Sequence, residues 1–352
     1  MTLQQYSRGL ESIPTSVTWY LADLGEARGK QQLFTRQSPQ RLSVLREHAL
    51  IESAVSSSRI EGIEVDQSRV RAVVLGNKML RDRMEEEVRG YREALRLIHE
   101  RGANLGVSQK TILELHRLVR GQIGDAGKYK ETDSDIIERQ PSGRHRVRFK
   151  SVSAGQTRDF VRQTVDLWNR CLRERWVHPL AAMAAFNLDF LCIHPFRDGN
   201  GRVSRLLLLL QCYHLGYEVG RYISIERLIE ENKERYYETL EQSSQGWHTG
   251  KHDAWPYVNY ILWILKNAYR EFEERLEDVR APRGAKTDLV EAAVRSFAGK
   301  FSLADLERAC PGVSRDMIRI VLRRLKSSGK VECLGRGPGA LWQKKGTTPK
   351  KR

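Results

Sequence analysis

The sequence lacks any long uncharged apolar run. No stretch approaches the roughly 18 such residues that a membrane-spanning helix needs. Its beginning, MTLQQYSRGLESIP, has no basic start followed by an apolar segment, so no secretory signal is expected. Cysteine is scarce: there are five in 352 residues, an odd number, and none forms a C-x-x-C pair. We therefore expect a cytoplasmic protein without a membrane segment, disulfide framework or structural zinc.

Positive charge is abundant but unevenly spread. The net charge is +16, and residues 283–352 hold 17 Lys or Arg against 6 Asp or Glu. A basic terminal module of this kind often contacts the phosphate backbone of nucleic acid. A soluble surface with a basic tail explains the same composition, so charge alone leaves both interpretations open.

Apolar residues recur mostly at three- and four-residue spacing, which predicts a mainly α-helical fold. One helix is expected to start near Pro39 and to end at Gly62, and another to start after Ser108. The segments HPLAAMAAFNLDFLCI and VSRLLLLLQCYHLG are apolar on most sides, which predicts two buried helices. They flank a short polar loop and would hold that loop rigidly.

One segment departs from the helical pattern. SDIIERQPSGRHRVRFKSV contains Ile136 and Ile137, a Pro-Ser-Gly turn signal, and then Val147 and Phe149 in alternation. This order predicts a β-hairpin. Because a lone hairpin is marginally stable, we expect it to lie as a flap on the helices.

The last part of the chain has a different pattern. RAPRGAKT, residues 280–287, is typical of a linker. Three short helical patterns and two strand-like pieces around a glycine-rich turn follow it. Three helices with a wing are the layout of a winged helix-turn-helix. The final GTTPKKR is expected to be disordered.

The polar loop IHPFRDGNGRVSR has the composition of a phosphate site. Gly199 and Gly201 let the backbone approach a ligand closely, and their N–H groups could cradle an anion. A helix expected to begin near Arg202 adds the positive end of its dipole. Arg202 and Arg205 share one helix face, and their guanidinium groups suit phosphate oxygens.

Two other residues of the loop suggest chemistry. Asp198 is a hard oxygen ligand, suited to a Mg²⁺ ion that also binds substrate phosphates. His194 could take a proton from an attacking hydroxyl, whereas Phe196 is expected in the core. Each residue alone has an ordinary structural explanation, such as a turn or a helix start. Their conjunction between two apolar helices favours transfer of a phosphorus-containing group from a nucleotide, without a Walker A loop.

HPFRDGNGRVSR resembles the signature of the Fic family, H-x-F-x-[DE]-G-N-G-R-x-x-R, at all eight fixed positions. The resemblance extends over about residues 19–276. Most members transfer AMP from ATP to a Ser, Thr or Tyr hydroxyl of a protein. The resemblance implies that His194 is the base and that Asp198 holds Mg²⁺. It also implies a nucleotide- and phosphate-binding set of Phe196, Gly199, Asn200, Gly201, Arg202, Arg205, Tyr236 and Tyr237.

Within that set, the resemblance implies an anion hole at Gly199, Asn200 and Gly201, and an adenine pocket bordered by the two tyrosines. It also implies a target-binding flap that contains Ile136, Ile137, Val147 and Phe149 and pairs with the target main chain. Relatives usually carry Asn near position 244, where this chain has Ser244.

A second pattern lies upstream, where SSSRIEG contains Ser57, Glu61 and Gly62. It resembles the family's inhibitory motif, [ST]-x-x-x-E-[GN]. The resemblance implies that Glu61 pairs with Arg205, so that ATP loses a γ-phosphate contact and binds unproductively. The carboxylate would also repel the triphosphate directly.

We therefore predict a mainly α-helical, autoinhibited protein adenylyltransferase with a Fic-type helical bundle and a β-hairpin flap. The expected parts are an N-terminal helical region (1–85), a catalytic domain (86–279), a winged-helix domain (280–346) and a basic tail (347–352). ATP and Mg²⁺ are the expected substrate and cofactor. A hydroxyl-bearing protein is the expected partner, and DNA and a second copy of the chain are left open.

Two alternatives remain at this point. Within the enzyme class, the chain could catalyse phosphocholine or phosphate transfer, or the reverse hydrolysis with Glu61 aligning water. Outside it, the chain could be a DNA-binding regulator in which the Fic domain is secondary.

Overall fold

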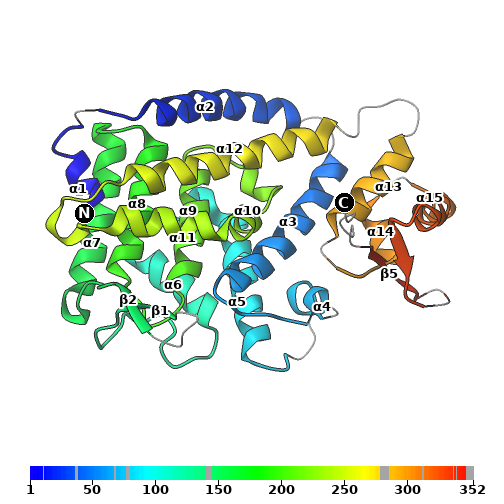
Figure 1. The fold of residues 1–352 in the computed structure, drawn as a ribbon, viewed down its shortest axis with the longest axis horizontal. Helices are drawn as coiled ribbons and strands as arrows, with labels where there is room; N and C mark the ends of the chain where they lie inside the picture. Colours follow the sequence, from blue (N-terminus) through cyan, green and yellow to red (C-terminus); the bar gives the residue numbers. More distant parts are fainter. Residues whose placement is uncertain are drawn as a thin grey trace, which may run out of the picture.

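The computed structural model describes residues 1–10, 12–35, 39–66, 69–76, 80–139, 145–277, 285–297, 299–310, 313–335, 337 and 339–345. These residues build two separate hydrophobic cores, a large one within residues 1–276 and a small one within residues 289–342. The first core supports a helical bundle and the second a C-terminal unit, which lies at one end of the molecule (Figure 1).

The bundle contains α1 (Thr2–Tyr6), α2 (Thr15–Thr35), α3 (Pro39–Ile60), α4 (Val70–Val74), α5 (Arg83–Arg101), α6 (Gln109–Arg120), β1 (Ile136–Arg139), β2 (His145–Phe149), α7 (Ala154–Glu174), α8 (Pro179–Ile193), α9 (Asn200–His214), α10 (Ile225–Glu231), α11 (Lys233–Ser244) and α12 (Trp255–Glu277). Three short 3-10 helices lie at Gly102–Asn104, Val219–Arg221 and Trp247–Thr249. The expectation of a mainly helical fold is therefore confirmed.

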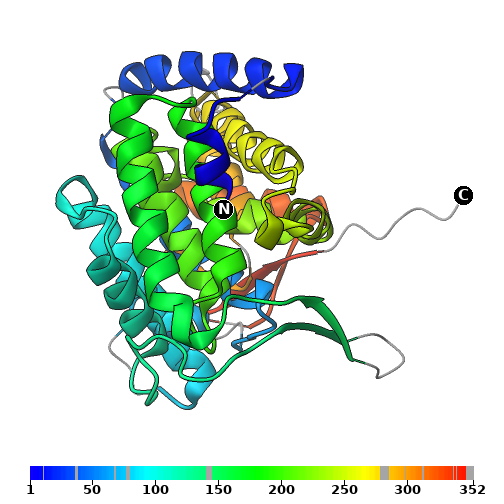
Figure 2. The same cartoon turned by 90° about the vertical axis from the view of Figure 1, so that its left-hand side faces the viewer.

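Helices α8 and α9 form the centre of the bundle, as their apolar sequences predicted. Every residue of α8 from Leu180 to Ile193 is buried, and so are the leucines of α9, Leu206 to Leu210. Helices α7 and α12 pack against α8, and α2 lies along α12 at the edge of the bundle (Figures 1 and 2). The loop between α8 and α9 is therefore held by two helices that are themselves immobilised by packing.

Local sequence signals set several helix boundaries. The Ser108 hydroxyl accepts a hydrogen bond from the Thr111 backbone and caps α6 as expected. Gly62 has a φ of 78°, and the N–H groups of Gly62 and Ile63 donate to the carbonyls of Arg59 and Ser58. This is the left-handed end that glycine favours, so the predicted end of α3 at Gly62 is confirmed.

Strands β1 and β2 pair antiparallel, with Ile137 opposite Val147 and Ile136 opposite Phe149. The predicted hairpin is therefore present, while its Pro-Ser-Gly turn signal lies outside the described residues. Figure 2 shows the two strands projecting from the lower side of the bundle. The Phe149 ring stacks on His248 at 5.3 Å between centroids, which anchors the base of the hairpin to the bundle.

The C-terminal unit contains α13 (Ala285–Ser296), β3 (Phe301–Ser302), α14 (Leu303–Ala309), α15 (Arg315–Ser327), β4 (Val331–Cys333) and β5 (Leu341–Lys344). Its strands form one antiparallel sheet in the order β3-β5-β4. Helix α13 already begins at Ala285, so residues 285–287 are helical rather than part of the expected linker. The rest of that linker and the basic tail 347–352 lie outside the described residues.

The C-terminal unit contacts α3. The ring of His48 meets Phe297 edge-on at 5.1 Å between centroids, and Val44 packs against the small core.

Among the residues that the structure describes, no helix is both long enough and apolar enough to span a membrane.

Candidate active site

The loop between α8 and α9 begins at His194, which ends α8 in a left-handed conformation with φ 51°. A residue with a Cβ pays about 1–2 kcal/mol for this conformation, a cost that buried neighbours must offset. Gly199 has φ 84°, and α9 begins directly after it at Asn200. The helix therefore starts two residues earlier than the expected start near Arg202, which brings more N–H groups to the loop.

Asn200 and Phe196 fix the shape of the loop. The Asn200 amide accepts from the Phe196 N–H at 2.9 Å and donates to the Phe196 carbonyl at 2.8 Å. The Phe196 ring is fully buried and stacks on His116 with 3.7 Å between centroids. Phe196 therefore supports the loop from beneath, as expected of a core residue.

The imidazole of His194 is neutral at pH 7. Its burial, together with the positive charge of Lys130, lowers its pKa to about 4. Lys130 is itself buried, and its ammonium donates to the Ser151 hydroxyl at 2.7 Å and to the Ile193 carbonyl at 3.4 Å. The His194 Nδ1 atom has no hydrogen-bond partner among the described residues. Sequence reasoning missed Lys130, because no local pattern places a lysine 64 residues upstream beside the loop.

Asp198 is surrounded by guanidinium groups. Burial raises the pKa of its carboxyl, but Arg202 and Arg120 outweigh burial and hold the pKa below its usual value. Its Oδ1 accepts from the Gly199 N–H at 2.6 Å and from Arg202 Nη2 at 3.3 Å. Its Oδ2 accepts a close hydrogen bond from Arg120 Nη1. The sequence indicated Asp198 and Arg202 but not Arg120.

Arg205 of α9 contacts the end of α3, where Ser57 and Glu61 lie. Its Nε and Nη2 donate to the Ser57 hydroxyl and carbonyl, each at 2.9 Å, and Nη2 also donates to Glu61 Oε1 at 2.8 Å. The predicted Glu61–Arg205 pair is thus present in the structure. The two bonds from Arg205 to Ser57 were not expected, and they hold the guanidinium independently of Glu61.

The Glu61 carboxylate also covers the start of α9. A Cβ atom added at Gly201 would lie 2.2 Å from Glu61 Oε1 and 3.3 Å from Arg205 Nη1. That Nη1 atom is buried without a hydrogen-bond partner among the described residues. A carboxylate at a helix N-terminus, beside an unsatisfied guanidinium donor, occupies a place suited to a phosphate oxygen.

The two tyrosines of α11 differ in their surroundings. Tyr236 is buried and packs against Tyr257 and Tyr260, with centroids 6.1 and 5.8 Å apart. The Tyr237 hydroxyl reaches the Ile60 carbonyl at 3.4 Å, at the end of α3. Arg148 of β2 lies over the Tyr237 ring, 5.2 Å from its centroid.

The hairpin is thereby linked to α11. Arg148 donates a close hydrogen bond to the Tyr237 carbonyl and forms an ion pair with Glu241 at 3.3 Å. Val147 has 55% of its surface exposed, whereas Phe149 packs against the bundle. Ser244 is buried and donates to the Glu241 carbonyl within its own helix at 3.0 Å.

The described residues contain no group of three or more His, Cys, Asp or Glu side chains able to hold a metal alone. The half-exposed Asp198 carboxylate is a single hard ligand two residues before the start of α9. That donor set fits Mg²⁺, which is commonly held by one or two carboxylates together with substrate phosphates and waters.

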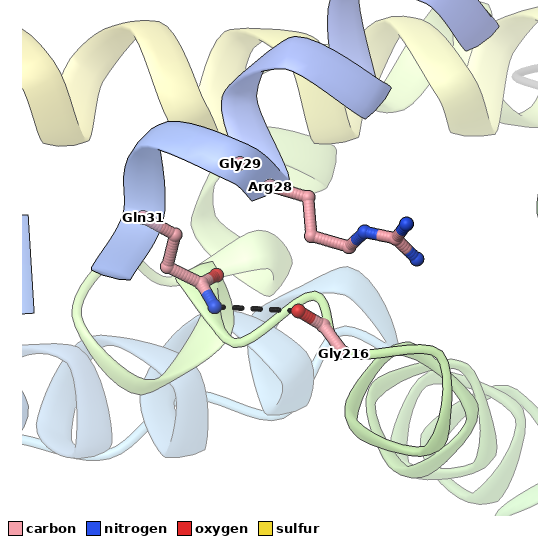
Figure 3. A pocket seen from close by; sticks show the side chains of 4 residues that line it. All are labelled: Arg28, Gly29, Gln31 and Gly216. Carbon is pink, nitrogen blue, oxygen red and sulfur yellow. Dashed lines mark hydrogen bonds between the residues drawn. The ribbon is translucent and has the colours of Figure 1, made fainter. Parts of the chain in front are cut away.

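A separate hollow lies between α2 and the turn after α9, lined by Arg28, Gly29, Gln31 and Gly216 (Figure 3). Gln31 points to the turn and donates to the Gly216 carbonyl at 3.3 Å. Because α9 is 15 residues long, its two ends are about 20 Å apart. The hollow is therefore not part of the loop site.

The loop lies within a stretch of the chain that is similar to known proteins. Residues 106–212 match the model of the Fic/DOC family. Over 221 residues the chain is 26% identical to Protein adenylyltransferase Fic of Culex quinquefasciatus, which covers 60% of this chain and 39% of that protein. The protein of the same name from Nematostella vectensis is 25% identical over 225 residues, with 60% and 46% covered. The matches therefore span less than half of these relatives' length.

Solved structures share the fold. A Fic family protein from Desulfovibrio desulfuricans superposes with a TM-score of 0.62 at 24% identity, covering 97% of this chain and 99% of that chain. A Fic domain containing signaling protein from Bacteroides thetaiotaomicron gives 0.60 at 20% identity, covering 70% and 94%. At these identities the likeness concerns the fold.

Proposed function

Because residues 106–212 match the model of the Fic/DOC family, we propose that the protein is an autoinhibited protein adenylyltransferase that transfers AMP from ATP to a Ser, Thr or Tyr hydroxyl. The observation that carries the proposal is the Glu61 carboxylate placed between Gly201 and Arg205, where a phosphate oxygen would bind. The names of the relatives, Protein adenylyltransferase Fic, support the same activity.

In this reaction the target hydroxyl attacks the α-phosphorus of ATP. The new bond joins the hydroxyl oxygen to that phosphorus, the bond to the β-phosphate oxygen breaks, and pyrophosphate leaves. The hydroxyl proton goes to His194, whose low pKa keeps the imidazole neutral and ready to accept it. Self-modification is included, since hydroxyl groups near the loop are always at high local concentration.

The remaining loop residues would bind the triphosphate. The N–H groups of Gly199, Asn200 and Gly201 form the anion hole at the start of α9, while Arg202 and Arg205 contact the β- and γ-phosphates. Asp198 would hold Mg²⁺, which when bound neutralises phosphate charge. Phe196 acts only through its support of the loop, because its ring is fully buried.

The hairpin and α11 would position the two substrates. We assign the target-binding flap to β1 and β2, with Ile136, Ile137, Val147 and Phe149, because a two-stranded sheet offers open edges for main-chain pairing. Tyr237 is suited to border the adenine, since its hydroxyl reaches the end of α3. Tyr236 would support it from the core.

The pH dependence of transfer tests the role of His194. Burial and Lys130 disfavour the imidazolium, so the neutral base persists as pH falls, and activity should be lost only near pH 4 instead of near 6.5. The measurement is kcat against pH for the Glu61→Gly variant at saturating Mg²⁺ and ATP. Lys130→Met should move the midpoint upwards. A midpoint between pH 6 and pH 7 for the Glu61→Gly protein would contradict the role of His194 as a buried, neutral base.

Other Fic chemistries, such as phosphocholine or phosphate transfer, are less well supported, because Asp198, Arg202 and Arg205 form a site for a whole triphosphate. De-AMPylation is the strongest of the alternatives. The Glu61 side chain is 31% exposed beside the loop and could align a water molecule.

For the C-terminal unit, residues 280–346, we propose a winged helix that binds duplex DNA. Its order of helices and strands, with β4 and β5 as the wing, supports this assignment. Helix α15 follows α14 and carries an exposed basic face. Arg323, Lys326 and Lys330 are exposed and have no acidic partner among the described residues, while Arg324 pairs with Glu291.

Removal of these charges tests DNA binding. A variant with Arg323, Arg324, Lys326 and Lys330 all replaced by Ala should bind duplex DNA more weakly. The salt dependence should flatten by about one unit per lost phosphate contact. Electrophoretic mobility over a range of salt concentrations measures both. The charge-matched control replaces the exposed Arg96, Arg101, Arg162 and Arg170 of the bundle. If the α15 variant and the bundle control variant bind duplex DNA equally well, the basic face of α15 does not bind DNA.

We place the protein in the cytoplasm, which its five free thiols support. Its protein substrate carries a hydroxyl side chain, and a homodimer is compatible with the activity.

A further inference from the structure

Behind the loop lies a cluster of charges of which the sequence indicated only Asp198 and Arg202. Glu87 of α5 has a side chain only 3% exposed, yet three arginines surround its carboxylate. Arg202 Nη1 donates to Glu87 Oε2 at 2.5 Å, and Arg83 Nε donates to Glu87 Oε1 at 2.8 Å. Arg120 Nη1 lies 3.4 Å from Glu87 Oε1.

The same three arginines reach Asp198. Arg120 Nη1 donates to Asp198 Oδ2, Arg202 Nη2 to Oδ1 at 3.3 Å, and Arg83 Nη2 lies 3.5 Å from Oδ2. Two carboxylates therefore share three guanidinium groups. One of them, Glu87, is buried, whereas Asp198 is half-exposed at the loop.

This sharing bears on metal binding. A divalent cation on Asp198 needs oxygen lone pairs that the guanidinium groups now occupy, above all those of Oδ2. Arg120 cannot turn away to solvent, because its side chain is 4% exposed and Asp125 holds it at 3.1 and 3.3 Å. When a cation binds Asp198, Nη1 loses its closer acceptor and keeps only the longer bond to Glu87, which must then compensate, since an unpaired buried charge is costly. Glu87 Oε1 is already within reach.

We propose that Glu87 is a positioning residue that accepts the Arg120 guanidinium when Asp198 binds the divalent cation, and that holds Arg202 towards the phosphates throughout. The proposal rests on the proposed function. The Arg120 guanidinium pairs with Asp198 until the metal–nucleotide complex binds. A small displacement then moves its Nη1 atom from Asp198 to Glu87.

A purely structural ion pair predicts something different. Buried ion pairs contribute little net stability, and a stabilising role alone would leave the metal requirement unchanged. Under the proposal, removal of the Glu87 charge leaves Arg202 and the Nη1 atom of Arg120 with Asp198 as the remaining charged acceptor. The cation must then displace both of them. Removal of the Arg120 charge has the opposite effect, because it takes away the competitor.

The test measures nucleotide binding as a function of Mg²⁺, without catalysis. A fluorescent ATP analogue with a non-cleavable α–β bridge is titrated at increasing MgCl₂, with all variants made in the Glu61→Gly protein. Glu87→Gln should raise the half-saturating Mg²⁺ concentration ~10-fold, the equivalent of one charge-assisted hydrogen bond. Arg120→Gln should lower it several-fold, and Glu87→Asp should restore part of the loss.

Glu86→Gln is the matched control. Glu86 is the neighbouring residue of α5, and its carboxylate accepts from the Gln122 backbone outside the cluster. Nucleotide binding by Glu86→Gln should depend on Mg²⁺ as it does in the Glu61→Gly parent.

The inference is overturned if Glu87→Gln and Arg120→Gln both keep the parent's Mg²⁺ dependence while the parent binds the analogue. If Glu87→Gln does not fold, as judged by circular dichroism, Arg120→Gln decides alone. A parent that binds no nucleotide at any Mg²⁺ concentration contradicts the proposed function, and the inference falls with it.

Discussion

Replacement of Glu61 by glycine should convert a nearly silent protein into one that modifies itself with AMP. In the structure the Glu61 carboxylate takes one donor of Arg205 and covers Gly201 at the start of α9. Its removal frees both places for the γ-phosphate, while the two hydrogen bonds that Arg205 donates to Ser57 keep its guanidinium in position. A charge-assisted hydrogen bond contributes about 1.5–3 kcal/mol, which corresponds to ~10- to 150-fold in productive ATP binding.

Because the Glu61 side chain is 31% exposed, we expect the lower half of that range. Mass spectrometry of the purified protein after incubation with ATP and Mg²⁺ should show added AMP on Glu61→Gly and little on wild type. Arg205→Ala in the same background should abolish the gain. A folded Glu61→Gly protein that gains no AMP and labels no lysate protein would show that the Ser57–Gly62 segment is an ordinary helix end.

His194→Ala should abolish AMP transfer and leave nucleotide binding nearly intact. The imidazole accepts the proton of the incoming hydroxyl and is not among the phosphate-binding groups, so its loss affects the chemical step. A general base usually contributes ~10²- to 10⁴-fold. Transfer rates and analogue affinity, both measured in the Glu61→Gly background, separate the two effects.

His214→Ala is the matched control for this substitution. His214 ends the same helix, α9, at its far end, where its ring pairs with the Gly102 carbonyl. Its removal should leave the transfer rate within a factor of about two, as expected of a site distant from the chemistry. Transfer by His194→Ala at the parent's rate would refute the role of this residue.

The loop and its two supporting helices could be predicted because their information is local. HPFRDGNGRVSR is contiguous, and the apolar character of α8 and α9 is visible in each segment alone. The end of α3 at Gly62 was predictable for the same reason, since glycine favours the left-handed conformation found there. The pairing of Glu61 with Arg205, 144 residues apart, came only from resemblance to a family.

The charges behind the loop could not be predicted in this way. Glu85, Glu86 and Glu87 are consecutive near the start of α5, with Glu85 and Glu86 in its first turn, and acidic residues there suggest nothing more than a favourable dipole interaction. Only the packing of α5 against α6 and α9 turns Glu87 towards Arg202, which is 115 residues away in sequence. Arg120 and Lys130 likewise lie in patterns typical of a solvated surface, and tertiary contacts alone bury them.

The most direct test of the central claim is the origin of the transferred group. Purified Glu61→Gly protein is incubated with Mg²⁺ and ATP labelled either in the α-phosphate or in the γ-phosphate, and protein-bound label is counted. Transfer of AMP from a site built around His194, Arg202 and Arg205 predicts label from the α-phosphate alone, with pyrophosphate released. Label from the γ-phosphate, or none from either position, would contradict the account.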